Sequence, residues 1–166
     1  MIFTALPAGA LVFLDANILL YHFTADAKYG APCTDLVERV ERQDITGFTS
    51  THVVSEMAHR LMTMEASLRF TCPFAGIAQW LKKHPTEVQQ LTQFRQAIQE
   101  VPRYRIQILA VPPDLLDQAA DVSQQAGLLH NDSVIVAIMR LHGLTNLASA
   151  DSDFDRFPGL TRYAPR

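Results

Sequence analysis

The sequence predicts one α/β domain with a mainly parallel sheet of four to five strands and helices on both faces. Short apolar runs typical of strands alternate with longer segments of helical spacing, which is the pattern of a parallel sheet. The first run, residues 11–14, is entirely apolar and is followed at once by Asp15, as in a strand buried on both faces. The length of 166 residues suits one such domain with a real core and is too short for two.

Each predicted strand is a short apolar run bounded by charged or turn-forming residues. The runs cover residues 11–14, 45–50, 106–111 and 144–148, and residues 160–164 add a short strand at the edge. Gly47 weakens the second run in its middle, and Pro165 stops the last one. The sheet therefore has four strands, or five with the edge strand.

Helical spacing and capping residues define the predicted helices. We expect them at residues 18–23, 32–42, 51–64, 74–83, 86–100, 112–126 and 132–142. Thr49, Ser50 and Thr51 each offer an N-cap for the third of these helices. The last helix is apolar nearly all round, so we expect it to be buried.

Residues 65–105 predict a helical insertion within the single domain of residues 1–166. Its two helices, 74–83 and 86–100, meet around His84 and Pro85, where we expect a break in helical structure. This is the most basic region of the chain. Its cations are Lys82, Lys83, Arg95, Arg103 and Arg105. A solvated helix face explains these charges at least as well as an RNA contact does.

Composition excludes several classes of protein. With 48% hydrophobic and 19% charged residues, the chain is expected to be soluble and globular. The net charge of −3 gives no global basic field, so any nucleic-acid contact must come from a local patch. Cys33 and Cys72 fit neither a disulfide framework nor a zinc pattern, which indicates a reducing compartment. No apolar run approaches the roughly 20 residues that span a bilayer. We therefore expect a cytoplasmic protein without a membrane partner.

Four acidic residues occupy positions that a layered α/β sheet would bring together. Asp15 and Asp151 each follow a predicted strand at its carboxyl end, where ligands bind in such sheets. Asp132 opens the buried helix 132–142, and Glu56 can reach the same crevice from helix 51–64. Taken alone, each has a simpler reading, such as a turn residue or a solvated glutamate. Together, several carboxylates would repel one another unless a hard divalent cation were bound, which favours Mg²⁺ or Mn²⁺.

Four short blocks carry a resemblance to a known family. In order, they are Asp15-Ala16-Asn17-Ile18-Leu19, Ser55-Glu56-Met57, Asn131-Asp132-Ser133 and Ser149-Ala150-Asp151-Ser152-Asp153-Phe154. They resemble the conserved blocks of the PIN-domain nucleases, and most closely the VapC-type ribonuclease toxins of bacterial toxin–antitoxin pairs. The match covers the two ends of the chain well and the middle poorly.

The resemblance implies a PIN-like three-layer α/β/α fold and a metal-dependent endoribonuclease. It further implies an RNA substrate, an antitoxin partner and Mg²⁺ or Mn²⁺ as cofactor. The implied catalytic and metal-binding carboxylates are Asp15, Glu56, Asp132 and Asp151, with Asp153 as a further acid near the metal and Asn17 and Ser149 as polar support. Because such a site is negative, RNA must be held by cations around it. The candidates are Arg60, Lys82, Lys83 and Arg140. We also expect a homodimer, with the 65–105 insertion contributing to a homodimer or antitoxin surface.

Two other functions stay open at this stage. An aspartyl-nucleophile phosphatase also places an aspartate after the first strand, but its usual second aspartate two residues on is here Asn17. Such an enzyme also needs a lysine block before the last acidic loop, and this chain has no clear one. A non-catalytic PIN-like module that only binds RNA or protein is the other alternative. The presence of all four carboxylates argues against it without excluding it.

Overall fold

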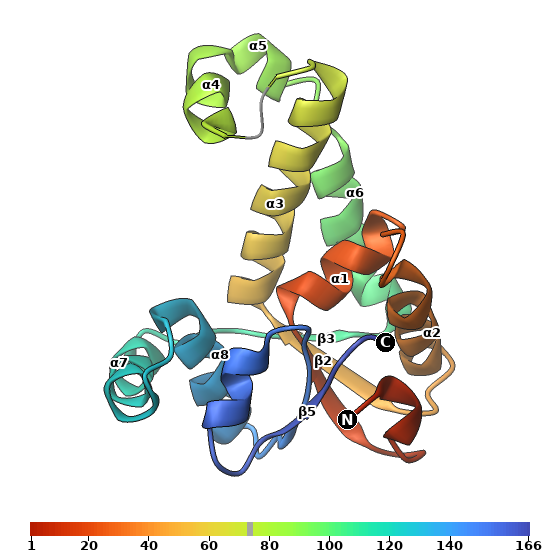
Figure 1. Cartoon of the computed structure of the whole chain (residues 1–166), viewed down its shortest axis with the longest axis vertical. Coiled ribbons are helices and arrows are strands. Elements are labelled where there is room, and N and C mark those ends of the chain that lie inside the picture. The colour runs from red at the N-terminus through yellow and green to blue at the C-terminus, as the bar shows by residue number, and fades with distance from the viewer. Residues whose placement is uncertain (73–74) are drawn as a thin grey trace.

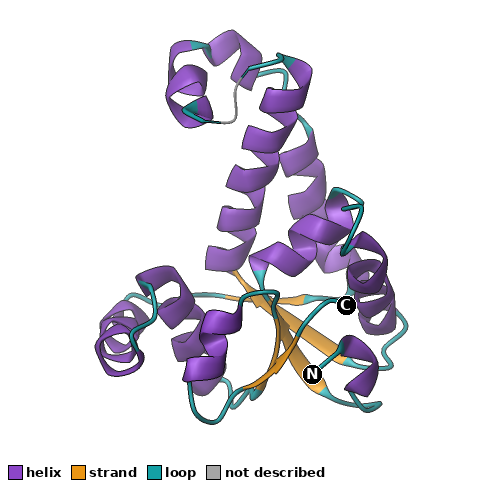
Figure 2. Ribbon diagram, viewed as in Figure 1, coloured by secondary structure: helices purple, strands orange, loops and turns teal. Residues whose placement is uncertain are grey.

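The computed structural model describes residues 1–72 and 75–166. Within them, five strands form one parallel sheet in the order β3-β2-β1-β4-β5. The strands are β1 (Leu11–Leu14), β2 (Thr46–Ser50), β3 (Gln107–Leu109), β4 (Asn146–Ala148) and β5 (Thr161–Tyr163). Figure 2 shows the sheet with helices on either side of it. The predicted three-layer α/β/α fold is confirmed, and the predicted edge strand lies at one edge of the sheet.

The helices divide between the two faces of the sheet. They are α1 (Ala16–Phe23), α2 (Gly30–Glu41), α3 (Thr51–Arg69), α4 (Ile77–Lys83), α5 (Pro85–Val88), α6 (Gln93–Glu100), α7 (Asp114–Ala126) and α8 (His130–Leu141), with short 3₁₀ turns η1 (Phe3–Ala5), η2 (Val101–Tyr104) and η3 (Ser152–Arg156). Helices α7 and α8 pack together on one side, and α1, α2 and α3 pack on the other (Figure 1). The strand order reverses after β3, and since crossovers between parallel strands are right-handed as a rule, this reversal moves the connecting helices to the other face.

The core forms where the apolar runs predict it. Val12, Phe13 and Leu14 of the central strand β1 are fully buried, whereas Leu11 at its start is 45% exposed. Helix α8 is buried without interruption from residue 133 to residue 139, as its apolar sequence predicts. It begins at His130, two residues earlier than expected, so Asp132 lies in its first turn.

Helix α3 is longer than its sequence pattern indicates, and Glu65 explains why. The predicted end lies near Met64, but the helix continues to Arg69. Glu65 is buried, and its carboxylate accepts hydrogen bonds from the backbone N–H groups of Thr92 and Gln93 at 2.9–3.2 Å. These N–H groups start helix α6, where a helix has no internal acceptors for them. Glu65 therefore caps the N-terminus of α6 and does not form a solvent-exposed end of α3.

The prediction of one continuous helix at residues 86–100 is wrong. Two helices, α5 and α6, occupy this segment, and residues 89–92 separate them. Leu91, within the break, is buried in a second small core with Ala66, Cys72, Ile77 and Leu81. The break before α5 is confirmed, since α4 ends at Lys83 and Pro85 starts α5. Helix α4 begins at Ile77 and not at residue 74, which lies outside the described residues. Strand β3 is likewise shorter than the expected residues 106–111.

Helices α3 and α6 form an antiparallel pair that extends away from the sheet, with α4 and α5 at its far end (Figure 1). The sequence predicts a hairpin between helices 74–83 and 86–100, but α6 instead pairs with α3, and we call this observed pair the hairpin. The small second core fills its far end. Among the described residues, no helix has both the length and the apolar character needed to cross a membrane.

Candidate active site

Asp15 stands at the carboxyl end of β1 and is fixed by three hydrogen bonds. It is the N-cap of α1, and its Oδ1 accepts a hydrogen bond from the backbone N–H of Ala16 at 2.6 Å. Its Oδ2 accepts one from the hydroxyl of Ser149 at 2.7 Å and another from the Asn17 side-chain amide. The residue is only 6% exposed. One carboxylate oxygen thus starts a helix while the other binds the loop that follows β4.

Asn17 and Ser149 join the loops that follow β1 and β4. The Asn17 amide also donates to Ser149 Oγ at 3.2 Å, and its Oδ1 accepts from the backbone N–H of Ala150 at 3.0 Å. Ser149 Oγ in turn accepts from the backbone N–H of Asp151 at 3.0 Å. Because β1 and β4 are neighbours in the sheet, these bonds hold Asp15 and Asp151 at the same edge. Asn17 and Ser149, which the resemblance implies as polar support, therefore connect the loops that carry Asp15 and Asp151.

The carboxylates at this edge perturb one another. Burial raises the pKa of Asp15 to about 6, against the opposing effect of its hydrogen bonds to Ser149 and Ala16, and the charges of Glu56 and Asp132 raise it further. Partial burial also raises the pKa of Asp132 to about 6, and the charges of Asp151, Glu56 and Asp153 add to that rise. All five predicted acids therefore contribute to one negative field at the carboxyl edge of the sheet.

The other three acids are more accessible. Asp151 is exposed and caps η3, with its Oδ1 accepting from the backbone N–H of Asp153 at 2.8 Å. Asp153 pairs with Arg156 at 3.0 Å. Glu56 is half-buried on α3 and lies 3.9 Å from Arg60, the weak surface pair that its spacing predicts.

The donor set fits a hard divalent cation. Every acid here supplies carboxylate oxygens, and the raised pKa values of Asp15 and Asp132 reflect burial and repulsion that a bound cation would relieve. The acids do not form a ready-made cage, however. Among the described residues, no three histidine, cysteine or acidic side chains are grouped closely enough to hold a metal ion together. A cation held by three or more of these acids would therefore require their side chains to rotate.

The predicted RNA-binding cations lie in three different places. Arg60 lies beside Glu56, and the exposed Arg140 sits over the Phe157 ring at 4.5 Å. Lys82 and Lys83 end helix α4, at the far end of the α3–α6 pair from the sheet (Figure 1). The structure therefore does not bring these two lysines to the carboxylates.

Arg162, a residue that the sequence analysis does not name, stabilises the loop that follows β4. Arg162 of β5 donates from Nη1 to the carbonyl of Ser149 at 3.1 Å and forms a two-bond pair with Asp155 at 2.7 and 2.8 Å. An arginine on a predicted edge strand resembles an ordinary solvated residue. No local signal in the sequence links it to a loop 13 residues earlier.

Comparison with known proteins identifies the family of the chain. The family model described as the PIN domain matches residues 12–160. The curated Ribonuclease VapC2 of Methanocaldococcus jannaschii is 26% identical over 146 residues, which are 87% of each chain.

Solved structures agree with this at the level of the fold. VapC20 of Mycobacterium tuberculosis, described as a sarcin-ricin loop cleaving toxin, aligns with a TM-score of 0.60 at 17% identity, covering 87% of this chain and 92% of that one. VapBC2 of Rickettsia felis, bound to a promoter DNA fragment, aligns with a TM-score of 0.57 at 14% identity, covering 93% and 98%. Since the family model spans nearly the whole chain, the protein belongs to the PIN domain family.

Proposed function

We propose that this protein is a metal-dependent endoribonuclease that hydrolyses RNA phosphodiester bonds and acts in the cytoplasm as the toxin of a type II toxin–antitoxin pair. The observation that carries the proposal is the buried, hydrogen-bonded Asp15 in a common negative field with Glu56 and Asp132. The curated relative named as a ribonuclease supports the reaction class. The relatives named as toxins support the biological role.

In this proposal, Asp15, Glu56, Asp132 and Asp151 hold Mg²⁺ or Mn²⁺, with Asp153 beside them. When bound, the cation supplies a Lewis acid that stabilises negative charge on the phosphate. Both oxygens of Asp15 accept hydrogen bonds, which hold its carboxylate in a fixed orientation. Asp132 or Asp153 accepts the proton of the attacking water.

A cleavage assay with two substrates tests the activity. The purified protein is incubated with structured RNA and, separately, with p-nitrophenyl phosphate, each with Mg²⁺, Mn²⁺ or EDTA. Internal cleavage of RNA that requires a divalent ion supports the nuclease. Release of nitrophenol without RNA cleavage supports the aspartyl-nucleophile phosphatase. RNA binding without either reaction supports the non-catalytic module.

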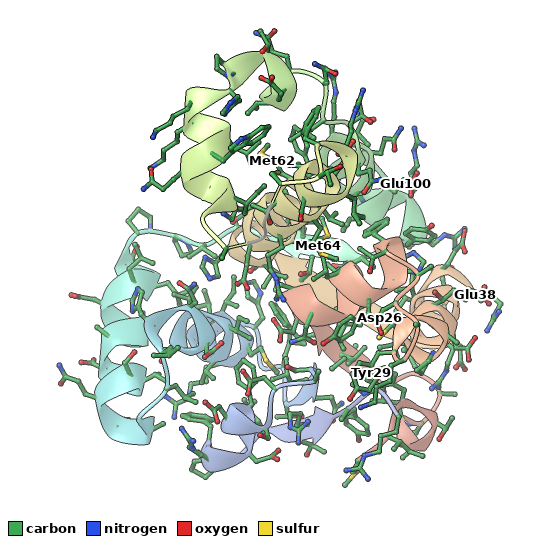
Figure 3. All side chains as sticks on the ribbon, turned by 45° about the horizontal axis from the view of Figure 1, so that its top comes forward. Asp26, Tyr29, Glu38, Met62, Met64 and Glu100 are labelled. Atoms are coloured by element: carbon green, nitrogen blue, oxygen red, sulfur yellow. The ribbon has the colours of Figure 1, made fainter. Side chains whose placement is uncertain are left out.

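A cleft beside α3 offers a surface for the antitoxin. It has a volume of about 540 Å³ and lies between the α1–α2 connection, α3 and α6. Phe23, Leu61 and Met64 give it an apolar floor, and Asp26 and Glu100 place carboxylates on its lining. Figure 3 labels Asp26, Met64 and Glu100 in this region. Such a lining suits a partner segment with alternating apolar and basic side chains. Coexpression with the product of a small adjoining reading frame, followed by pull-down of wild type and Glu100→Lys, tests this assignment.

The homodimer remains a prediction, and within the 65–105 segment the surface offered for it lies around Ile98 and not around Trp80. Trp80 stacks on His84 at 3.9 Å and lies 5.7 Å from Phe70, so its aromatic area serves packing at the far end of the hairpin. A mostly apolar cleft between α3, α6 and β3 instead exposes Ile98 and Ile108. Light scattering on wild type and Ile98→Glu tests this surface. A dimer that Ile98→Glu leaves intact would exclude it.

A further inference from the structure

A second concave surface lies next to the loop that carries Asp151. It has a volume of about 460 Å³, and its lining consists of Lys28, Tyr29, Ala150, Arg162, Ala164, Pro165 and Arg166. We call it the basic cleft, because three of these residues are cationic. Tyr29, labelled in Figure 3, precedes helix α2, so the cleft joins the start of that helix to the end of β5. None of its cations is among the RNA-binding candidates that the sequence analysis names.

The charges of the cleft are unevenly compensated. Asp155 neutralises Arg162, whose side chain is only 13% exposed. Lys28 and Arg166 are exposed, and among the described residues neither forms an ion pair. The Lys28 ammonium lies over the Tyr29 ring, 4.7 Å from its centroid, which restricts its position. The nearby Asp26 carboxylate accepts from the backbone N–H groups of Lys28 and Tyr29 and lines the separate cleft beside α3. Two positive charges are thus left for a ligand.

Ala150 joins the basic cleft to the carboxylates. Its backbone N–H donates to Asn17 within the candidate active site, while the residue also lines the basic cleft. Ser149 and Asp151 lie on either side of it in the chain. An RNA strand with one phosphodiester at the acids can therefore reach the basic cleft with a neighbouring phosphate. The chain as a whole carries −3, so a polyanion must be held by local cations of this kind.

We propose that Lys28 and Arg166, supported by Arg162, bind the phosphate of a nucleotide that flanks the one being cut. This inference rests on the proposed endoribonuclease function and adds a substrate subsite to it. The two exposed cations contact the phosphate. Arg162 acts as a positioning residue, because its pairs with Asp155 and the Ser149 carbonyl connect the wall of the cleft to the Asp151 loop.

RNA binding without catalysis tests the subsite. Fluorescence anisotropy in EDTA measures the affinity of wild type and Lys28→Gln/Arg166→Gln for single-stranded oligoribonucleotides of increasing length. The matched control is Arg95→Gln/Arg103→Gln, which removes the same charge at two exposed positions, on α6 and η2. We expect the cleft variant to bind about tenfold more weakly at low salt. Two lost phosphate contacts should also reduce the slope of log affinity against log salt by about 1.4. The control should match wild type in both.

The outcomes separate the subsite from the proposed function. Wild-type cleavage of RNA, together with unchanged affinity and salt slope in the cleft variant, overturns the subsite and leaves the nuclease intact. If wild type cleaves no RNA with any metal, the proposed nuclease activity is overturned. Weaker RNA binding by the cleft variant would still show that the basic cleft binds RNA. Loss of antitoxin binding with unchanged RNA binding assigns the cleft to a protein partner and overturns the inference. Thermal melts of the variant verify its fold.

Discussion

Replacing Asp132 by Asn separates the electrostatic cost of the acidic cluster from its use in metal binding. The charge of Asp132 is opposed by Asp151, Glu56 and Asp153, and no hydrogen bond to its carboxylate is found among the described residues. The amide has nearly the same volume, so the substitution removes one repelling charge and leaves packing intact. Without metal, the folded variant should therefore be at least as stable as wild type. With metal, it lacks one ligand.

The pH dependence follows from the direction of the pKa shift. Folding raises the pKa of Asp132 from 3.8 to about 6, so the folded protein keeps a proton that the unfolded chain has released. This contribution to stability is present below the unfolded pKa and is lost as the pH rises through about 6. A shift of about two pKa units corresponds to at most about 3 kcal/mol. Because Asp132 is only half-buried, solvent screening reduces this to about 1 kcal/mol.

Thermal melts in EDTA measure the effect. At pH 7.5, Asp132→Asn should melt about 2–4 °C above wild type, and at pH 4 the two proteins should melt together. Binding of Mn²⁺ at a hundred times its Kd should then stabilise wild type by about 2.7 kcal/mol, or roughly 5 °C or more. The variant should gain much less.

Asp117→Asn is the matched control, because Asp117 is an exposed acid in the first turn of α7. It should respond to Mn²⁺ as wild type does. If Asp132→Asn also responds to Mn²⁺ as wild type does, Asp132 is not part of a metal site. If its melting temperature in EDTA shows no pH-dependent difference from wild type, the acids do not share the field described above.

Three further predictions concern other parts of the structure. Asp15→Asn and Asp151→Asn should each lower metal-dependent RNA cleavage by about two orders of magnitude or more, measured in single-turnover assays. Ser149→Ala should lower cleavage less, since it removes the hydroxyl between Asp15 and Asp151 but no carboxylate; activity equal to wild type would contradict this. Glu65→Ala should destabilise the protein by about 1–3 kcal/mol in urea unfolding and speed hydrogen exchange at the start of α6, and unchanged exchange there would refute its capping role.

The sequence predicts the sheet well because its strongest signals come from burial on both faces. Residues 12–14 and the apolar helix α8 have no polar face that could be misread, and both lie where expected. The helical hairpin is predicted less well. Val88, Leu91, Phe94 and Ile98 have the spacing of one helix, yet Leu91 fills the second core instead. The backbone N–H groups of Thr92 and Gln93 donate to the Glu65 carboxylate. These contacts span 27 and 28 residues of the chain. Local periodicity contains no information about such a contact.

The residues of the candidate site likewise divide into those whose place the sequence pattern predicts and those whose place it does not. An acid after a buried strand is visible in the sequence, so the position of Asp15 and Asp151 at the carboxyl edge of the sheet could be predicted from pattern alone. The bonds that align them, between Asn17 and Ala150 and between Ser149 and Asp15, join residues more than 130 positions apart. Only the family resemblance singles out Asn17 and Ser149. Of the cations of the basic cleft, Lys28 lies in a turn, Arg162 on the short strand β5 and Arg166 after it, and no periodicity marks them. The density of charge along the sequence instead favours Lys82 and Lys83 as RNA-binding residues, and the fold places both far from the acids.

Asp151, and not Asp15, gives the cleaner test of catalysis. Asp15→Asn can keep its helix cap through Oδ1, but it places an amide donor opposite the Asn17 amide and the Ser149 hydroxyl, which also donate. A loss of activity in that variant therefore mixes lost charge with a loosened loop. Asp151 is exposed and uses only Oδ1, towards the backbone N–H of Asp153, a bond that asparagine can keep. In EDTA, Asp151→Asn should melt within about 1–2 °C of wild type and yet lose RNA cleavage by about two orders of magnitude. Full activity of this well-folded variant would remove Asp151 from the catalytic set.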